Sequence, residues 1–292
     1  METKIKVAIQ GIKGSFHHVV TLRLFGDEVE IYPCETFDET VKAVVDEKVP
    51  FAVMALENSI AGSIIPNYAL IDQNNLRIVG EYGLSIHHNL MAIPGQHIEN
   101  LTEVRSHPMA LLQCKSFFKQ YPHIRLVEAE DTADEARIIS EENCLGRGAI
   151  ASQEAADLFG LSILASSIQT IKNNVTRFVV VQNEKAVKPS KQINKAALKF
   201  ILDHKRGSLA AVLNVMSDCQ LNLTKIQSLP VIETPGKYSF FVDVTFDEFE
   251  YYKKAREMSF EKKVECIVQN KQNKIETTSL ENDKNKKNII NI

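Results

Sequence analysis

The chain has 292 residues, of which 44% are hydrophobic and 24% are charged, a composition typical of a globular protein with about two domains. A formal net charge of −3 gives no global basic field, so we expect no nucleic-acid partner and no binding to an anionic membrane. No apolar run approaches the roughly 20 residues that a helix needs to cross a bilayer.

The first 75 residues alternate between strand and helix patterns. The chain enters a strand directly at "KIKVAIQG", without the apolar segment of a signal peptide, and the next strand patterns are "VEIYPC" and "FAVMALENS". Helix patterns follow each strand, in "IKGSFHHVVTLRLFG", "TFDETVKAVVDEKV" and "SIIPNYALIDQ". Thr36 and Glu39 have the spacing of a capping box at the start of the second helix. This alternation predicts βαβ units with a mainly parallel sheet.

A second region of the same kind follows. Its strand patterns are "LRIVGEYGLSIHHNLMAI", "IRLVEAED", "GAIAS" and "LSILASSI", and "RFVVVQN" is a closing strand. Helices are predicted in "SHPMALLQCKSFFKQY", where Ser106 is a suitable N-cap before Pro108, and in "QEAADLFG". Another is predicted in "TADEARIISEEN", which opens at Thr132 with Glu135 in the capping-box position.

The pattern changes after a polar, lysine-rich linker at 184–194. Residues 195–270 have the order βαββαβ, which fits a small α+β ferredoxin-like domain. Residues 271–292 are rich in Asn and Lys, and we expect a disordered tail there. We therefore expect a first domain at 1–183 and a second domain at 195–270. The first domain should have two lobes, one at about 1–80 plus 171–183 and the other at about 81–170.

The cysteines and histidines give no metal-site pattern. Five scattered cysteines without a C-x-x-C predict reduced thiols in a cytoplasmic protein. The pairs His17-His18 and His87-His88 have no acidic or cysteine partner at ligand spacing, so we interpret them as ordinary polar or packing residues. We expect no bound metal.

Polar residues gather where predicted strands end, the position at which α/β sheets bind ligands. These positions hold hydroxyl, amide and glycine residues in "GIKGSF", "ENSIAGS", "SHPMALLQC", Asp131-Thr132 and "NNVTRF". Taken singly, each is more simply a turn or a helix cap. Together they form a set of neutral donors and helix N-termini with one arginine, which suits a small carboxylate ligand. No Walker loop and no G-x-S-x-G nucleophile motif is present.

The order of these motifs resembles the prephenate dehydratase family. "GIKGSF", "LENSIAGS", "SHPMALLQC", "GAIASQEAADLFGLSILASSI" and "NNVTRF" carry this resemblance, and "GSLAAVL", "NLTKIQSLP" and "GKYSFFVD" resemble its ACT regulatory domain. The resemblance covers about residues 5–265. It implies an α/β catalytic region of two lobes, like a type 2 periplasmic-binding protein, followed by an α+β ferredoxin-like ACT domain. It also implies conversion of prephenate to phenylpyruvate, water and CO2 in L-phenylalanine biosynthesis, without a cofactor.

The family's functional residues can be placed on matching positions of this chain. The resemblance assigns protonation or hydrogen bonding of the leaving hydroxyl to Thr176, and we expect Arg177 to grip a substrate carboxylate with two parallel bonds. Asn174 and Phe178 would hold the geometry. Further substrate donors expected from the matching motifs are Asn58, Ser59, Ser106, Gln113 and Thr132.

Some positions depart from the family pattern. Ile12 and Ser15 replace the usual Pro and Thr of the first loop, and no acid precedes "NNVTRF". In the ACT region the usual E-S-R-P reads Gln227-Ser228-Leu229-Pro230, which predicts weakened control by L-phenylalanine. Matching positions around the expected effector site are Gly207, Leu209, Asn222 and Leu223. ACT domains usually pair, so we expect a homodimer or homotetramer.

Two alternatives stay open at this point. An arogenate dehydratase would differ only in an amino acid side arm on the substrate. A non-catalytic small-molecule sensor could use the same kind of cleft with an ACT domain, although the presence of Thr176 favours an enzyme. A periplasmic solute receptor fits neither the start of the chain nor its C-terminal domain.

Overall fold

The structure is a computed structural model that describes residues 4–187, 193–202, 205–231, 234, 236–259 and 264–266. Its described residues form two compact units, one of residues 4–70 and 82–179, the other of residues 71–81 and those from 180 onward. The predicted domain boundaries at 183 and 195 stay predictions. The predicted tail at 271–292 lies outside the described residues.

The first sheet has the strand order β2-β1-β3-β11-β5, with the short β4 paired to β3. Its strands are β1 (Lys6–Gln10), β2 (Glu30–Cys34), β3 (Phe51–Asn58), β4 (Gly62–Ser63), β5 (Leu76–Ser85) and β11 (Val175–Asn183). Strand β1 pairs in parallel with both β2 and β3. The helices between them are α1 (Phe16–Phe25), α2 (Phe37–Val45) and α3 (Ile65–Gln73). The predicted βαβ alternation is therefore confirmed for this region.

Strand β3 shows how the sequence positions polar groups. Its first six residues, Phe51 to Leu56, are buried, because a strand inside such a sheet is covered on both faces. Its last two residues, Glu57 and Asn58, are only partly buried. The polar end of this apolar run therefore lies at the carboxyl edge of the sheet.

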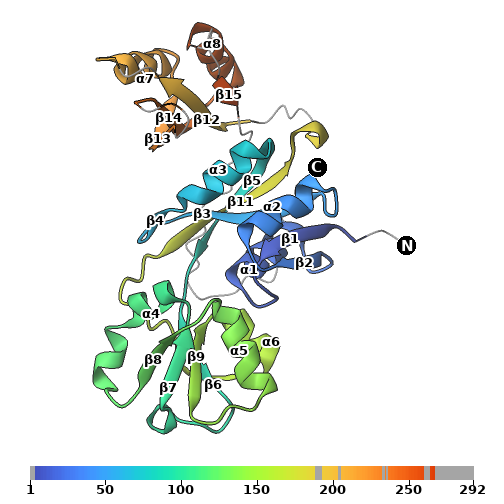
Figure 1. Cartoon of the computed structure of the whole chain (residues 1–292), viewed down its shortest axis with the longest axis vertical. Helices are drawn as coiled ribbons and strands as arrows, with labels where there is room; N and C mark the ends of the chain where they lie inside the picture. Colours follow the sequence, from blue (N-terminus) through green and yellow to red (C-terminus); the bar gives the residue numbers. More distant parts are fainter. Residues whose placement is uncertain are drawn as a thin grey trace. The chain divides into compact units, whose positions relative to one another are not determined.

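The second sheet has the strand order β10-β6-β9-β7-β8. Its strands are β6 (Asn89–Ala92), β7 (Glu103–Ser106), β8 (Arg125–Glu128), β9 (Arg147–Ala151) and β10 (Ser162–Ala165). Three α-helices and two short 3-10 turns join them: α4 (Pro108–Cys114), α5 (Thr132–Glu141), α6 (Gln153–Phe159), η1 (Ile98–Asn100) and η2 (Phe117–Gln120). Figure 1 shows α5 and α6 together on one side of this sheet. We call the first sheet with its helices the first lobe and the second sheet with its helices the second lobe.

Helix caps differ from prediction at two of three positions. Thr36 caps α2 as expected, since its hydroxyl accepts the Glu39 N–H at 3.1 Å. At α4 the cap is His107 rather than Ser106, because proline takes the first helical position and the residue just before it becomes the cap. At α5 the cap is Asp131 rather than Thr132, because its carboxylate accepts two backbone N–H groups, from Ala133 and Asp134.

Two segments cross between the lobes and are hydrogen-bonded to each other. The Ile86 N–H donates to the Asn174 carbonyl at 2.7 Å, and the Ile168 N–H donates to the His88 carbonyl at 2.8 Å. The Gln169 amide adds two bonds, accepting from the His88 N–H and donating to the Ile86 carbonyl. These crossing segments, 86–88 and 168–174, therefore form a hinge made of paired backbone.

The lobes also meet at the loop after β1. The Ser152 hydroxyl, at the start of α6, donates to the Gly14 carbonyl at 2.8 Å. Gly11 has a φ of +89°, and a Cβ there would lie 3.0 Å from an Asp131 carboxylate oxygen. Only glycine fits the backbone and the space at this position.

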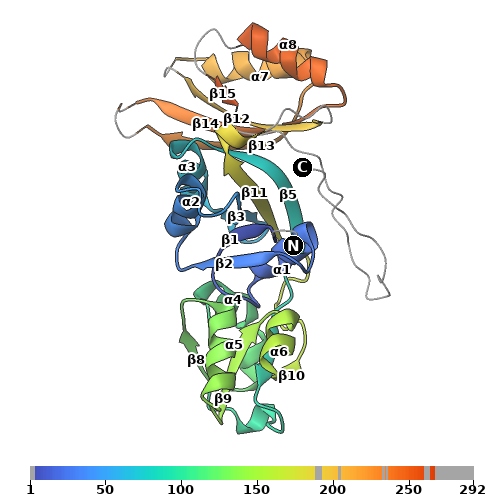
Figure 2. The same cartoon turned by 90° about the vertical axis from the view of Figure 1, so that its right-hand side faces the viewer.

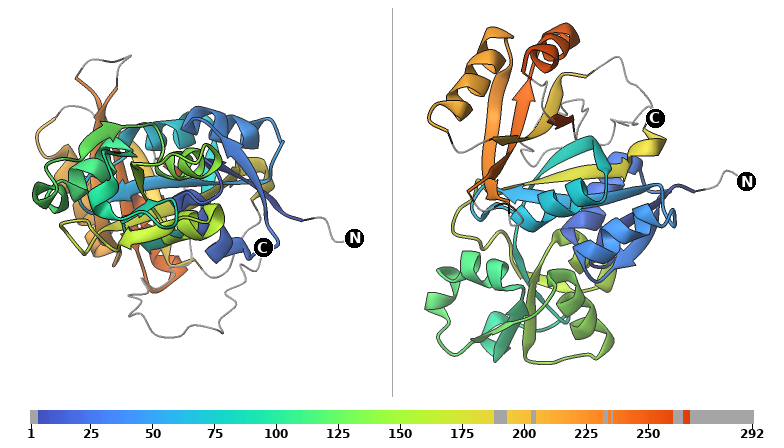
Figure 3. Two further views of the ribbon diagram at one scale, coloured as in Figure 1. Left: turned by 90° about the horizontal axis from the view of Figure 1, so that it is seen from below. Right: turned by 45° about the horizontal axis from the view of Figure 1, so that its top comes forward.

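The second unit contains a four-stranded antiparallel sheet of order β13-β14-β12-β15. Its elements are β12 (Lys195–Leu202), α7 (Ser208–Asp218), β13 (Asn222–Pro230), β14 (Tyr238–Thr245), α8 (Phe249–Ser259) and β15 (Val264–Cys266). Helices α7 and α8 lie side by side on one face of this sheet (Figure 2 and Figure 3). The predicted βαββαβ ferredoxin-like fold is confirmed.

Two ion pairs explain why residues 71–81 group with this sheet. The Lys195 ammonium contacts both carboxylate oxygens of Glu81 at 2.9 Å, and Lys199 pairs with Asp72. The Lys195 and Glu81 side chains are only 11% and 10% exposed, so this pair is shielded from solvent. These pairs attach the end of α3 and the middle of β5 to β12.

No helix in the described ranges is long and apolar enough to span a membrane. Cys34, Cys114, Cys144 and Cys219 form no disulfide. Within the described ranges of the chain, no group of three His, Cys, Asp or Glu side chains could hold a metal ion.

Candidate active site at the hinge

Polar side chains from β3 and β11 meet beside the hinge. The Asn58 amide nitrogen lies 2.9 Å from the Thr176 hydroxyl oxygen and 2.6 Å from the Asn174 amide oxygen. Thr176 is 8% exposed and Asn174 is 1% exposed. The end of β3 and the start of β11 thus bring together three residues predicted from two motifs, "LENSIAGS" and "NNVTRF".

The direction of these hydrogen bonds is fixed by the backbone. The Asn58 amide oxygen accepts the N–H groups of Ile60 at 3.0 Å and Ala61 at 2.9 Å, which can only donate. The Asn58 amide nitrogen must therefore face the other way and donate to both Asn174 and Thr176. Its two protons are then fully used.

The same logic extends into the second lobe. Because Asn174 accepts through its amide oxygen, its amide nitrogen donates, to the Gln113 side-chain oxygen at 2.8 Å. That oxygen is also 3.0 Å from Nε2 of His88, which must carry the proton because a carboxamide oxygen only accepts. A polar chain, which we define as His88, Gln113, Asn174, Asn58 and Thr176, therefore runs through the hinge, and each of its hydrogen bonds has an assigned donor and acceptor.

Two hydrogen-bond donors of the polar chain, one on Thr176 and one on Gln113, are not used within it. The Thr176 oxygen accepts from Asn58, so its proton is left to donate, and no acceptor for it occurs among the described residues. The Gln113 amide nitrogen likewise has no acceptor among the described residues, because the contacts of this carboxamide with His88 and Asn174 are both made by its oxygen. The arrangement can therefore offer an O–H and an NH₂ group to a ligand that carries acceptor oxygens.

Ser59 fastens the loop after β3 to the start of β11. Its hydroxyl accepts the Val175 N–H at 2.9 Å and donates to the Asn173 carbonyl at 3.3 Å. Its own N–H donates to the Val175 carbonyl at 2.8 Å. In this arrangement Ser59 positions Asn174 and Thr176 through the backbone.

Ser106 and Thr132 have no contact with the polar chain in the described structure. Ser106 is fully buried, and its hydroxyl donates to the Ile150 carbonyl at 2.7 Å, so its one proton is not available to a ligand. Thr132 follows the cap residue Asp131 as the first residue of α5 and is half-buried. Burial raises the pKa of the Asp131 carboxyl above its usual range. Both predicted substrate donors stay predictions.

Arg177 and Thr176 project from opposite faces of β11. Successive side chains of a strand alternate, and the contacts agree with this rule. Thr176 contacts Asn58, whereas an Arg177 guanidinium nitrogen lies 3.4 Å from a carboxylate oxygen of Glu57, the residue before Asn58. Carboxylate binding by Arg177 therefore stays a prediction, and Glu57 is a partner that the sequence did not suggest.

Phe178 follows Thr176 by two residues on β11, so both side chains lie on the same face of the strand. It is 2% exposed and packs edge-on against His17 of α1, with ring centroids 5.0 Å apart. His17 is buried and its Nε2 accepts the Ala55 N–H at 3.3 Å. The expected supporting role of Phe178 remains a prediction that this packing makes physically reasonable.

Sequence reasoning missed His88. As the second residue of an HH pair it carries no motif spacing, and we interpreted it as a packing residue. A signal was present, because His88 stands in the long strand pattern "LRIVGEYGLSIHHNLMAI", which runs across the predicted boundary between the lobes. His87, its neighbour, is exposed and contacts the Ser167 hydroxyl instead.

The two buried histidines predict a pH-dependent stability. Burial lowers the pKa of both His17 and His88 to about 4, whereas an unfolded histidine titrates near 6.5. Between these values the unfolded chain binds protons that the native chain does not, so the free energy of unfolding falls as the pH drops from about 6.5 to about 4. Between pH 7 and pH 5 each histidine should account for about 2 kcal/mol.

Urea unfolding of the wild type, His88→Gln and His87→Gln at pH 7 and pH 5 checks this. We expect His88→Gln to lose about 2 kcal/mol less than the wild type over this range, and the exposed His87 variant to follow the wild type. Equal losses in all three proteins would contradict the assignment to His88.

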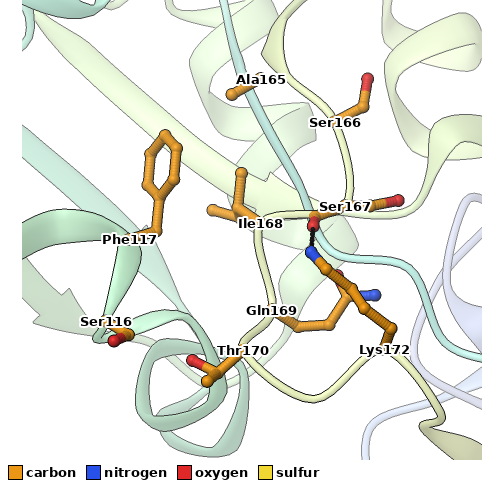
Figure 4. Close-up of a pocket in the computed structure, with 9 residues that line it drawn as sticks. All are labelled: Ser116, Phe117, Ala165, Ser166, Ser167, Ile168, Gln169, Thr170 and Lys172. Atoms are coloured by element: carbon orange, nitrogen blue, oxygen red, sulfur yellow. Dashed lines mark hydrogen bonds between the residues drawn. The ribbon is translucent and has the colours of Figure 1, made fainter.

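A separate cavity of about 400 Å³ is lined in part by the crossing segment 168–174 (Figure 4). Its lining consists of Ser116, Phe117, Ala165, Ser166, Ser167, Ile168, Gln169, Thr170 and Lys172. None of the predicted site residues lines it. Thr170 nevertheless binds the Gln113 carbonyl through both its N–H and its hydroxyl, so the cavity wall also supports the polar chain.

In the second unit, the predicted effector positions lie at two element starts. Gly207 is the N-cap of α7 with a φ of +84°, and Leu209 packs partly against the core. Asn222 opens β13 and is exposed, while Leu223 packs partly against the core. Their effector role stays a prediction.

Two α/β lobes joined by a paired hinge, with neutral donors gathered at that hinge, define a two-lobed protein of the periplasmic-binding-protein type. The second unit adds a ferredoxin-like domain. The chain belongs to the prephenate dehydratase family, because the family model described as "Prephenate dehydratase" matches residues 7–186.

Similar proteins agree with this assignment. The arogenate dehydratase/prephenate dehydratase 2, chloroplastic, of Arabidopsis thaliana is 36% identical over 252 residues, which cover 85% of this chain and 66% of that protein. The chain therefore spans just under two thirds of that relative's length. A solved structure described as GqqA, a novel type of quorum quenching acylase, has a TM-score of 0.81 at 27% identity and covers 91% of this chain and 97% of its own. The prephenate dehydratase of Arthrobacter aurescens in complex with L-Phe has a TM-score of 0.80 at 22% identity. The match covers 92% of this chain and 90% of that protein.

Proposed function

We propose that the protein is a prephenate dehydratase that acts in L-phenylalanine biosynthesis. Prephenate carries two carboxylates and a ring hydroxyl, and the product is phenylpyruvate with water and CO2. The electron pair of the ring–carboxylate bond enters the ring, the ring C–O bond breaks, and the leaving oxygen takes up one proton. This balance needs no oxidant or reductant, so the proposal includes no cofactor.

The main barrier is the departure of a hydroxide-like leaving group, since formation of the aromatic ring supplies the thermodynamic drive. A donor positioned at the leaving oxygen is worth roughly 10²–10⁴ in rate. The single observation that carries the proposal is the Asn58–Thr176 bond, which leaves the Thr176 proton free to point at a ligand. An accepted hydrogen bond also polarises the O–H that is donated. Because threonine is a weak acid, its role is hydrogen-bond stabilisation, and the consumed proton comes from solvent.

Neutral donors suit the reacting carboxylate as well. CO2 leaves uncharged, so a strong ion pair to that carboxylate would stabilise the ground state more than the transition state. The Gln113 amide nitrogen offers a weaker, uncharged contact. Gln113 and Thr176 can therefore bind the substrate without holding back its decarboxylation, while Asn58 orients the Thr176 hydroxyl.

An acylase activity, as the GqqA structure is described, is less well supported by this site. Acyl transfer needs a nucleophile next to a base that removes its proton. Within the described residues Thr176 contacts an amide donor, and the nearest ring of the polar chain, His88, has its Nε2 proton directed at Gln113. The site thus favours a proton donor over a nucleophile.

One assay separates the remaining candidates. We expect the purified full chain to form phenylpyruvate from prephenate, measured by absorbance, and to process arogenate more slowly or not at all. Turnover of arogenate in preference to prephenate would make the chain an arogenate dehydratase. Binding of prephenate without product, measured by calorimetry, would instead indicate the non-catalytic sensor.

We further propose that the ferredoxin-like domain is an ACT regulatory domain that responds to L-phenylalanine and pairs two or four chains. The L-Phe complex of the Arthrobacter aurescens protein supports such an effector. Leu229 stands where the family has an arginine, so inhibition should be weaker than in relatives with E-S-R-P. Repeating the assay with phenylalanine, and measuring mass by light scattering, tests both points. A cytoplasmic location is supported by Cys34, Cys114, Cys144 and Cys219, which form no disulfide.

The role proposed for Arg177 can be tested with its partner. We expect Arg177→Lys to raise KM for prephenate severalfold with a smaller change in kcat, because a lysine cannot form two parallel bonds to a carboxylate. Glu57→Gln is the matched control, since it removes the charge that Arg177 contacts without touching the guanidinium. If Arg177→Lys leaves KM unchanged, and both variants lose the same stability, then Arg177 only forms the ion pair with Glu57 and does not bind the substrate.

A further inference from the structure

The polar chain ends at a residue that no motif accounts for. His88 is 5% exposed and stands between β5 and β6, where the chain crosses from one lobe to the other. Its backbone is held on both sides, by its N–H bond to the Gln169 amide oxygen at 3.0 Å and by the Ile168 N–H on its carbonyl at 2.8 Å. The ring also packs edge-on against Phe16, at 5.8 Å between centroids. The imidazole therefore has little freedom to move.

Gln113 needs an external constraint. Gln113 lies near the end of α4, and its side chain is flexible. Only its amide oxygen contacts the other residues of the polar chain. One hydrogen bond, from Asn174, would allow the carboxamide to rotate about that contact. The second bond, from His88 Nε2, occupies the other lone pair and fixes the plane of the amide. With both lone pairs filled, the amide nitrogen can only face away from the polar chain.

We propose that His88 is a positioning residue, whose Nε2–H holds the Gln113 carboxamide so that its nitrogen faces the substrate. This inference rests on the proposed dehydratase function for its kinetic test. Nδ1 of His88 is buried without a hydrogen-bond partner among the described residues, so the ring cannot switch to the other tautomer and keep its bond to Gln113. His88 acts through Gln113 and takes no proton from the substrate.

The kinetic experiment compares donor-keeping and donor-lacking variants. His88→Leu should lower kcat roughly tenfold, the order expected for one lost hydrogen bond at a reacting site. His88→Gln, which places an N–H near the position of Nε2, should stay within about threefold of the wild type. His87→Leu changes the exposed neighbour and is the matched control, with no expected change.

A double-mutant cycle distinguishes positioning from general support of the fold. In a Gln113→Ala background, His88→Leu should change kcat by less than about twofold, because the group on which it acts is gone. Effects that multiply, or equal losses in His88→Leu and His88→Gln, would overturn the proposal.

The protonation state of the His88 ring can be measured without any substrate turnover, so this test does not depend on the dehydratase function. A long-range ¹H–¹⁵N spectrum should show His88 protonated at Nε2 and bare at Nδ1, and this Nε2 proton should exchange faster with solvent in Gln113→Ala. A ring protonated at Nδ1, or exchange unaffected by Gln113→Ala, would overturn the proposal whatever the activity. A wild type that binds prephenate without converting it would count against the dehydratase function alone.

Discussion

Thr176→Ala is expected to lower kcat by roughly 10²–10⁴ and to change prephenate affinity little. The reason is that the hydroxyl acts on an oxygen that gains charge only as the C–O bond breaks. An interaction made mainly in the transition state appears in kcat and kcat/KM to the same extent. Steady-state kinetics with prephenate, together with a binding measurement for a non-reacting diacid, checks both parts.

Two further substitutions separate chemistry from packing at this position. Thr176→Val keeps the β-branched shape but leaves one of the two Asn58 amide protons without its acceptor, at a cost of about 1–3 kcal/mol in stability. It should be as inactive as Thr176→Ala. Thr176→Ser restores the hydroxyl and should recover most of kcat. Equal loss of turnover and of binding in Thr176→Ala, or an active Thr176→Val, would exclude a transition-state role.

Much of the site could be predicted because its residues come from strand ends. Asn58 follows an apolar run, and Thr176 and Asn174 precede another, so the sheet order brings the two together. The same alternation that identifies strands also separates Thr176 from Arg177, since adjacent strand residues face opposite ways. The strand pattern "VTRFVVV" carries that signal in the sequence.

The polarity of the site could not be predicted from residue types. An amide side chain can point its oxygen or its nitrogen toward a neighbour, and only the backbone N–H groups of Ile60 and Ala61 decide the choice. The role of His88 depends on which atom of the Asn174 and Gln113 amides donates and which accepts. Motif spacing therefore cannot predict that role. The caps at His107 and Asp131 were missed by one residue for a simpler reason, the local preference of proline and of a carboxylate.

Because one bond direction determines the rest, Asn58→Asp is the most informative change in the site. The substitution is nearly isosteric and keeps the oxygen that accepts from Ile60 and Ala61. The second oxygen, however, replaces the nitrogen that donates to Thr176 and Asn174. The Thr176 proton would then turn to the new carboxylate, and the leaving oxygen would lose its donor.

We expect Asn58→Asp to lower kcat by about 10² or more, and the added negative charge next to a diacid to raise KM as well. The pH dependence gives a signature that simple misfolding would not. As the pH falls through the pKa of the introduced carboxyl, that group regains a proton to donate. The activity of the variant relative to the wild type should therefore rise toward acid pH.

Asn183→Asp is the matched control for the added charge. Asn183 ends β11, its amide oxygen accepts the Lys185 N–H at 3.1 Å, and the same substitution there keeps this acceptor. Its kcat and pH profile should follow those of the wild type. An Asn58→Asp enzyme with near-normal turnover at neutral pH would mean that the Thr176 proton does not depend on Asn58, and the assigned polarity of the chain would be wrong.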